Sequence, residues 1–113
     1  MTIELPDVHK SHEFDVSDLL RIMERLRDPS DGCPWDIKQT FVSVIPHTLE
    51  ECYELVDAIQ QGDLPHVAEE LGDVLFQVIF YSELGKELGA FDFHAVVDGI
   101  ARKLLRRHPH MFA

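Results

Sequence analysis

Residues 49–80 decide the fold, and they read LEECYELVDAIQQGDLPHVAEELGDVLFQVIF. The first half of this stretch carries an apolar stripe at helical spacing, made of Leu49, Tyr53, Val56 and Ile59. Gly62 is typical of a helix end and Asp63 of a helix start, because glycine adopts left-handed backbone and aspartate caps free N–H groups. The stretch therefore predicts two antiparallel helices joined by a tight turn.

The two helices extend beyond this stretch. We expect the first from Thr40 to about Gln61, interrupted or begun late at Pro46, because proline lacks an N–H. We expect the second from Asp63 to Leu88, ended by Gly89. Its predicted buried face is Val67, Leu71, Val74, Leu75, Val78, Ile79 and Leu84. The run VLFQVIFY, residues 74–81, is apolar nearly all round, which predicts burial by its own chain and by a second subunit.

The flanking segments are also predicted to be helical. Asp15 or Ser17 caps a helix with Leu19, Leu20, Met23 and Leu26 on one face, and the loop DPSDGCPWD follows at 28–36. Asp92 caps a last helix, limited by Pro109, with an inward face of Phe93, Val96, Val97, Ile100 and Leu104. We predict an all-α fold, an antiparallel bundle of about four helices completed by dimerisation, with a flexible arm at 1–14 and one helical domain at 15–113.

Length and charge limit the classes of function. A chain of 113 residues supports one core, and its net charge of −11 disfavours a nucleic acid polymer or an anionic membrane as partner. No apolar run is long enough for a membrane span, no signal peptide begins the chain, and Cys33 and Cys52 lack CxxC spacing. We therefore expect a cytoplasmic protein.

Charge is unevenly distributed along the chain. Between Gln39 and Gly85 there is no Lys or Arg, but there are nine acids: Glu50, Glu51, Glu54, Asp57, Asp63, Glu69, Glu70, Asp73 and Glu83. Basic residues return as Arg102, Lys103, Arg106 and Arg107. An acidic middle and a basic end suggest a metal site beside an anion site.

Four of the acids are predicted to converge. Glu51 and Glu54 are three residues apart on one predicted helix, and Glu70 and Asp73 repeat that spacing on the next, at a similar distance from the turn. A solvated acidic face is the ordinary alternative. We favour a divalent cation site for three reasons. No Lys or Arg between Gln39 and Gly85 offsets the repulsion between the carboxylates, and the acids adjoin the apolar stripe instead of lying opposite it. Gly72, inside the helix, suggests close packing beside the site.

The same residues carry a family resemblance. EECYE followed by EELGD resembles the EExxE…ExxD signature of the MazG nucleotide pyrophosphohydrolases, in the all-α NTP pyrophosphatase superfamily. The resemblance runs from Leu20 to Phe112, through LRIMERLRDPSDGCPWDIKQTF, HTLEECYELVDAI, EELGDVLFQVIF and KLLRRHPHMF. The ordered set with GCPWD and RRHPH is more specific than EExxE alone.

The resemblance implies Mg²⁺, with Mn²⁺ as a substitute, bound by Glu51, Glu54, Glu70 and Asp73. It implies cleavage of ribo- or deoxyribonucleoside triphosphates between the α and β phosphates, in a homodimer or a tetramer that clears surplus or damaged nucleotides. Longer members of the family continue beyond the HPH motif and carry a second similar domain. The chain is thus expected to be a short stand-alone form or an N-terminal-type domain.

Substrate contacts are predicted at both ends of the chain. Lys103 and Arg107 match the family's phosphate-contacting residues and Arg106 lies beside them, although a cationic end also suits a helix dipole. Trp35 is either a platform for a base or, as we favour, a core anchor of its loop. Asp36, Lys38 and Gln39 follow it at the expected pocket edge and are weaker candidates for substrate contacts. His108 and His110 are interpreted as a helix end or phosphate contact rather than a zinc pair, and the stripe of Phe76, Ile79 and Phe80 as core or dimer interface.

The expected reaction is attack of a metal-bound water on the α-phosphorus, with Glu50 or Glu69 accepting the proton. A di-iron carboxylate bundle is disfavoured, because aspartate and glutamate stand where its histidines would be. GCPWD and RRHPH favour the MazG branch over relatives that cleave dUTP or phosphoribosyl-ATP. A catalytically weak or inactive domain that dimerises, senses nucleotides or binds a partner stays open as the alternative.

Overall fold

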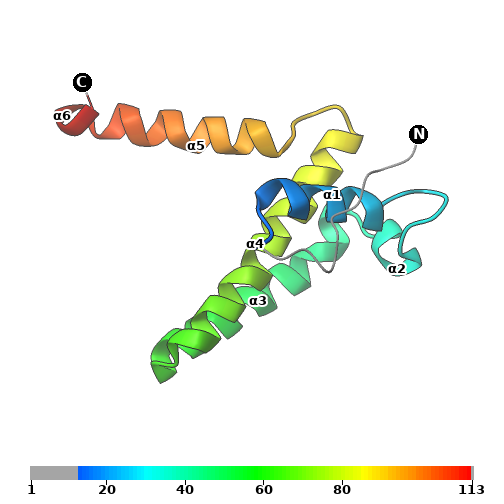
Figure 1. Ribbon diagram of the computed structural model, residues 1–113, viewed down its shortest axis with the longest axis horizontal. Coiled ribbons are helices and arrows are strands. Elements are labelled where there is room, and N and C mark those ends of the chain that lie inside the picture. The colour runs from blue at the N-terminus through cyan, green and yellow to red at the C-terminus, as the bar shows by residue number, and fades with distance from the viewer. Residues whose placement is uncertain (1–12, 113) are drawn as a thin grey trace.

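The computed structural model describes residues 13–112, and all its regular elements in that range are helices. Two long helices, α3 (Phe41–Gln61) and α4 (Leu64–Glu87), form an antiparallel hairpin (Figure 1). Gly62 ends α3 in left-handed backbone, with a φ of 74°, and Asp63 caps α4 by accepting from the His66 N–H. The predicted hairpin and its turn chemistry are therefore confirmed.

Pro46 does not interrupt the first helix of the hairpin. Helix α3 begins at Phe41, and Thr40 and Ser43 form a capping box in which each side chain accepts from the other residue's backbone N–H. This strong start places Pro46 inside the helix, where the chain continues without a break. The expectation of an interruption or a late start is corrected.

Helix α1 (Val16–Leu26) crosses the open end of the hairpin and packs against α4 (Figure 1). Asp15 is its N-cap and forms a capping box with Asp18, as one of the two predicted caps. The core lies at this crossing. It consists of Met23, Val44, Ile79, Phe80 and Leu84, with half-buried Leu19, Leu20, Phe41, Phe76, Tyr81 and Phe93 against it.

The loop after α1 contains a one-turn helix, α2 (Pro34–Ile37), where the sequence predicted only irregular structure. Gly32 is required before it, because a Cβ there would collide with the carbonyl oxygen of Leu26. The N–H groups of Gly32 and Cys33 donate back to the carbonyls of Asp28 and Leu26, each at 2.9 Å. The loop is thereby folded tightly onto the end of α1.

The last long helix departs from the predicted bundle. After a turn at Gly89, where φ is 69°, α5 (Phe93–Arg107) and the short α6 (Pro109–Phe112) run away from the hairpin (Figure 1). The face predicted to point inward is largely exposed, at Val96, Val97, Ile100 and Leu104. The prediction is wrong for this chain because α5 turns away from α4, and no other helix within residues 13–112 lies along it.

Part of the predicted buried face of α4 is exposed as well. Leu71, Leu75 and Val78 are 51%, 40% and 38% exposed, whereas Ile79 and Leu84 are buried as predicted. The flexible arm predicted at 1–14 lies almost entirely outside the described residues, of which Glu13 and Phe14 are the first. None of the helices in the described part of the chain is both long enough and apolar enough to cross a membrane.

Candidate cation site and adjoining pocket

Four carboxylates converge midway along the hairpin. Glu51 and Glu54 project from α3, and Glu70 and Asp73 project from α4. One oxygen atom from each of the four residues lies within 4.8 Å of the others. The repeated three-residue spacing and the tight turn at Gly62 bring the two pairs level, so this cluster could hold a metal ion.

The electrostatics of the cluster fit a cation. Burial, and then the negative charge of Asp73, Glu54 and Glu70, raise the pKa of Glu51 above its ordinary value. In both Glu51 and Glu70, the buried oxygen Oε2 has no hydrogen-bond partner among the described residues. Orphaned carboxylate oxygens are costly unless something positive binds them, and clustered hard oxygens suit Mg²⁺ or a similar divalent cation.

A histidine that the sequence analysis missed also belongs to this site. His66 lies one turn before Glu70 on α4, and its Nε2 is 3.0 Å from Glu70 Oε1. This contact leaves Oε2 of Glu70 as the free ligand atom. The i,i+4 spacing of His66 and Glu70 on a predicted helix is a signal that could have found it.

The two predicted proton acceptors lie differently. Glu50 is exposed and lines an open groove of about 880 Å³ together with Glu54, His66 and Glu70. Glu69 is also exposed, but it lines neither of the two pockets that adjoin the carboxylates. Glu50 is therefore the better placed of the two.

Gly72 does not pack closely beside the site. An added Cβ there would meet no described atom within 4 Å, apart from its own helix backbone. The argument that close packing explains this glycine is therefore wrong for the single chain. The glycine leaves open space beside α4 at this position.

A second hollow, a pocket of about 280 Å³, also adjoins the carboxylates. Aromatic rings and a few polar groups make up most of its lining, which consists of Trp35, Gln39, Val44, His47, Glu51, Asp73, Phe76, Gln77 and Phe80. Two of the cluster's acids, Glu51 and Asp73, thus belong to both the cation site and this pocket. An apolar pocket with a few polar groups at a charged cluster is the usual form of a small-molecule site.

Trp35 is not the core anchor that the sequence favoured. Its side chain is 57% exposed, and its ring meets that of His47 edge-on at 5.6 Å between centroids. The short helix α2 holds it at the rim of the pocket, where an indole face can stack on a ligand. The stripe of Phe76, Ile79 and Phe80 is partly core as predicted, but Phe76 and Phe80 also line the pocket, where the sequence predicted no site.

Polar groups beside the pocket form a chain of hydrogen bonds between the hairpin helices. Thr48 Oγ1 on α3 lies 2.8 Å from Gln77 Oε1 and 2.6 Å from the Tyr81 hydroxyl, both on α4. When Thr48 donates to the Gln77 side-chain oxygen, the hydroxyl of Tyr81 is free to donate to Thr48. The amide of Gln77 is thereby held at the pocket lining.

The remaining predicted contacts lie away from the pocket. Asp36 is buried and Lys38 is exposed, and neither lines the pocket, whereas Gln39, the third residue predicted at the pocket edge, does. Lys103, Arg106 and Arg107 are exposed on α5, which diverges from the hairpin (Figure 1). At the end of that helix, Nδ1 of His108 lies 2.7 Å from the Leu104 carbonyl oxygen.

The fold and the site together define an all-helical domain whose hairpin places ExxE and ExxD carboxylates, a group that could hold a metal ion, beside an aromatic pocket. The family model of the MazG nucleotide pyrophosphohydrolase domain matches residues 39–112. The chain belongs to the MazG family.

Curated relatives match most of the chain. The nucleoside triphosphate pyrophosphohydrolase of Escherichia coli K12 is 54% identical over 98 residues, 87% of this chain and 37% of that protein. The nucleoside triphosphate pyrophosphohydrolase/pyrophosphatase MazG of Thermotoga maritima is 50% identical over 95 residues, 84% of this chain and 37% of that protein. The chain thus spans little more than a third of these relatives.

A crystal structure of a mazG-related protein from Thermotoga maritima has the same fold. It superimposes with a TM-score of 0.72 at 28% identity, covering 86% of this chain and 82% of that chain. The all-α fold class predicted from the sequence is confirmed by the helices and by this likeness.

Proposed function

We propose that this domain hydrolyses nucleoside triphosphates to the monophosphate and pyrophosphate, with Mg²⁺ bound by Glu51, Glu54, Glu70 and Asp73. The convergence of the four carboxylates beside the aromatic pocket carries the proposal. The names of the relatives from Escherichia coli and Thermotoga maritima support the reaction class. Mn²⁺ has the same preference for oxygen ligands and is expected to substitute.

The phosphates and the nucleoside of the substrate would occupy two neighbouring sites, the carboxylate cluster and the aromatic pocket. The bound Mg²⁺ would orient the phosphates, neutralise charge that develops on them and make a coordinated water more acidic. The pocket would take the nucleoside, with the base against Trp35 and the rings of Phe76 and Phe80. Because Glu51 and Asp73 belong to both sites, the α-phosphate, which adjoins the sugar, would lie nearest these two carboxylates.

Glu50 would accept the proton of the attacking water. Its side chain is exposed, and it lines the open groove together with Glu54 and Glu70, two of the four clustered acids. A carboxylate that lines the groove beside the ligands, without being one of them, can exchange protons with bulk water after each turnover. Glu69 is exposed outside both pockets and is a weaker choice.

The basic residues of α5 would reach a triphosphate through a second copy of the chain. Lys103, Arg106 and Arg107 lie on α5, which runs away from the hairpin of its own chain (Figure 1). The same helix exposes an apolar stripe, and α4 exposes Leu71 and Leu75. We therefore propose a homodimer in which these apolar faces meet and the cationic helix end of one chain serves the acidic site of the other.

A product analysis tests the reaction. The purified chain is incubated with Mg²⁺ and a panel of ribo- and deoxyribonucleoside triphosphates, and the products are separated by ion exchange. We expect monophosphate and pyrophosphate, abolished by EDTA and by Glu54→Gln but retained in Asp98→Asn, which removes an exposed acid on α5. Diphosphate with orthophosphate would exclude attack at the α-phosphorus, and no turnover by the wild type would favour a binding or inactive domain.

A mixing experiment tests the shared site. Glu54→Gln and Arg107→Ala are each expected to be inactive alone, because one lacks a cation ligand and the other a phosphate contact. Mixed and allowed to exchange subunits, they should regain activity, since a hybrid dimer contains one site with both intact residues. Failure to regain activity in a mixture that forms hybrid dimers would place the cations and the acids of one site on the same chain.

A further inference from the structure

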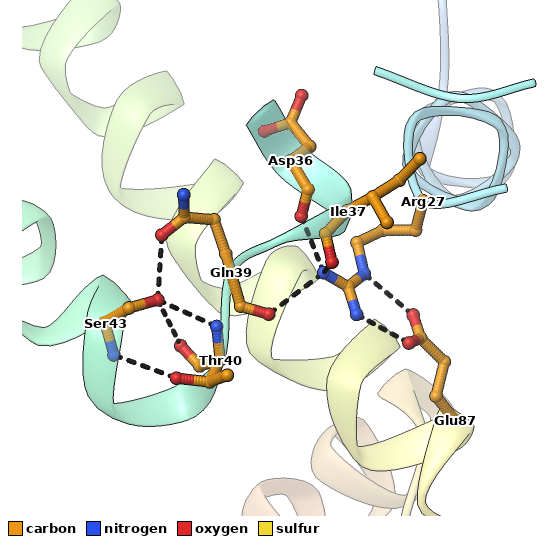
Figure 2. A network of polar contacts seen from close by, with 7 residues as sticks. All are labelled: Arg27, Asp36, Ile37, Gln39, Thr40, Ser43 and Glu87. Carbon is orange, nitrogen blue, oxygen red and sulfur yellow. Dashed lines mark hydrogen bonds and ion pairs between the residues drawn. The ribbon is translucent and has the colours of Figure 1, made fainter. Parts of the chain in front are cut away.

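Arg27 joins three parts of the molecule, the end of α1, the end of α4 and the loop that carries Trp35. It is the C-cap residue of α1, and its side chain is only 9% exposed. Its Nε and one terminal nitrogen, Nη2, donate to the two carboxylate oxygens of Glu87, at 2.9 and 2.6 Å (Figure 2). Glu87 is the last residue of α4, so this two-pronged ion pair fixes the guanidinium at the end of the hairpin.

The other terminal nitrogen of Arg27 holds the loop. Nη1 donates to the backbone carbonyls of Asp36, Ile37 and Gln39, at 2.6, 3.1 and 3.1 Å (Figure 2). Carbonyls at the end of a helix lack partners further along it, and these three lie at and just beyond the end of α2. A helix of four residues is not stable by itself, so its position depends on such contacts.

This loop forms one wall of the pocket. Trp35 and Gln39 line it on the loop side, and Glu51 and Asp73 line it on the hairpin side. Arg27 itself lies 5.6 Å from the centre of the Phe80 ring, which is a further part of the lining. The distance between the Trp35 wall and the carboxylates is therefore set through the Arg27 guanidinium.

We infer that Arg27, held by Glu87, is a positioning residue that sets the Trp35 wall of the pocket and so governs nucleotide binding. The inference rests on the proposed function, in which this pocket takes the nucleoside. Arg27 lines neither the pocket nor the cation site and acts only through the loop. Its loss is therefore expected to weaken binding of the nucleotide more than the chemical step.

Arg27→Lys is the variant that tests this role. A lysine keeps the charge but presents one ammonium, which cannot reach both Glu87 oxygens and the three carbonyls at once. We expect KM for the best triphosphate to rise about tenfold, the effect of losing a charge-assisted contact, with a much smaller change in kcat. Glu87→Gln, which keeps an acceptor but removes the charge, should raise KM in the same direction by less.

The control is Arg25→Lys. Arg25 is on the same helix and also pairs with the loop, at Asp31 over 2.9 Å, but on its early part, before α2. The Arg25→Lys substitution should leave KM unchanged. Thermal melts followed by circular dichroism show the temperature range in which each of the three variants is fully folded. The kinetics are measured within that range.

A second readout needs no catalysis. Trp35 is the only tryptophan of the chain, so its fluorescence anisotropy in nucleotide-free protein reports the mobility of this loop alone. We expect lower anisotropy in Arg27→Lys and Glu87→Gln than in the wild type and Arg25→Lys. Unchanged anisotropy, or an unchanged KM with altered kcat, would overturn the inference. If the wild type hydrolyses no triphosphate, the proposed function fails, while the anisotropy still decides whether Arg27 positions the loop.

Discussion

Nε2 of His66 lies 3.0 Å from Oε1 of Glu70, one turn further along α4. The contact occupies one oxygen of Glu70 and leaves the other, which is buried and has no partner among the described residues, for the cluster of four carboxylates. Groups that orient a metal ligand from outside the coordination sphere typically contribute 10- to 100-fold in metal affinity. The arrangement thus gives a histidine a role in a site made otherwise of acids.

The first prediction follows from this contact. His66→Ala should weaken Mn²⁺ binding by about 10- to 100-fold, because the Glu70 carboxylate loses the partner that orients it. Isothermal titration calorimetry with Mn²⁺ measures the change directly. His94→Ala, which removes a histidine on α5, should bind like the wild type. Equal affinity of His66→Ala and the wild type would show that the contact does not orient Glu70.

The second prediction concerns pH. The pKa of Glu51 is raised in the folded protein, so without a cation the folded state takes up a proton before the unfolded state does. The metal-free domain should therefore become more stable as the pH falls from neutrality through this raised pKa to the ordinary value. Glu51→Gln should be more stable than the wild type at pH 7 in EDTA, and the difference should shrink as the pH falls. Thermal melts across this range that run in parallel for both proteins would contradict the prediction.

The third prediction concerns the hydrogen bonds beside the pocket. Thr48→Val removes the hydroxyl that bonds both Gln77 Oε1 and the Tyr81 hydroxyl. These two polar groups then lack a hydrogen-bond partner, which should lower the unfolding free energy by about 1–3 kcal/mol. Tyr81→Phe keeps the ring that stacks on Phe41 and removes one hydroxyl, so its cost should be smaller, about 1 kcal/mol. Urea unfolding measures both. A Thr48→Val protein as stable as the wild type would mean that water replaces the lost partner.

The fourth prediction uses two glycines at the hairpin. Gly72→Ala should stabilise the isolated chain by about 1 kcal/mol, because the position is inside a helix and the added methyl group meets open space. Gly62→Ala should destabilise it by about 1 kcal/mol, because φ there is 74°. Urea unfolding at low and high protein concentration compares them. Destabilisation by Gly72→Ala only at high concentration would show that a second chain packs against that glycine.

Several features could be read from the sequence because they depend on local chemistry. Gly62, Asp63 and the repeated ExxE and ExxD spacing predict a hairpin with level carboxylates, since helical geometry alone fixes where these side chains emerge. The wrong prediction at Pro46 has a local cause as well. The capping box of Thr40 and Ser43 outweighs the proline and starts the helix at Phe41.

Other features depend on contacts between distant segments, and only the tertiary structure decides them. Trp35 is exposed on a loop whose carbonyls accept from Arg27, and Arg27 in turn pairs with Glu87, 60 residues away in the sequence. The divergence of α5 follows from the turn at Gly89 and leaves the predicted inward face uncovered by the described part of the chain.

The sequence by itself determined the helices, the hairpin and the acidic cluster, because each follows from spacing within one or two adjacent helices. The tertiary structure decided the wall of the pocket and the path of α5. An apolar stripe shows that a helix buries one face, but it does not specify which surface covers it. That choice depends on where the turns direct each helix.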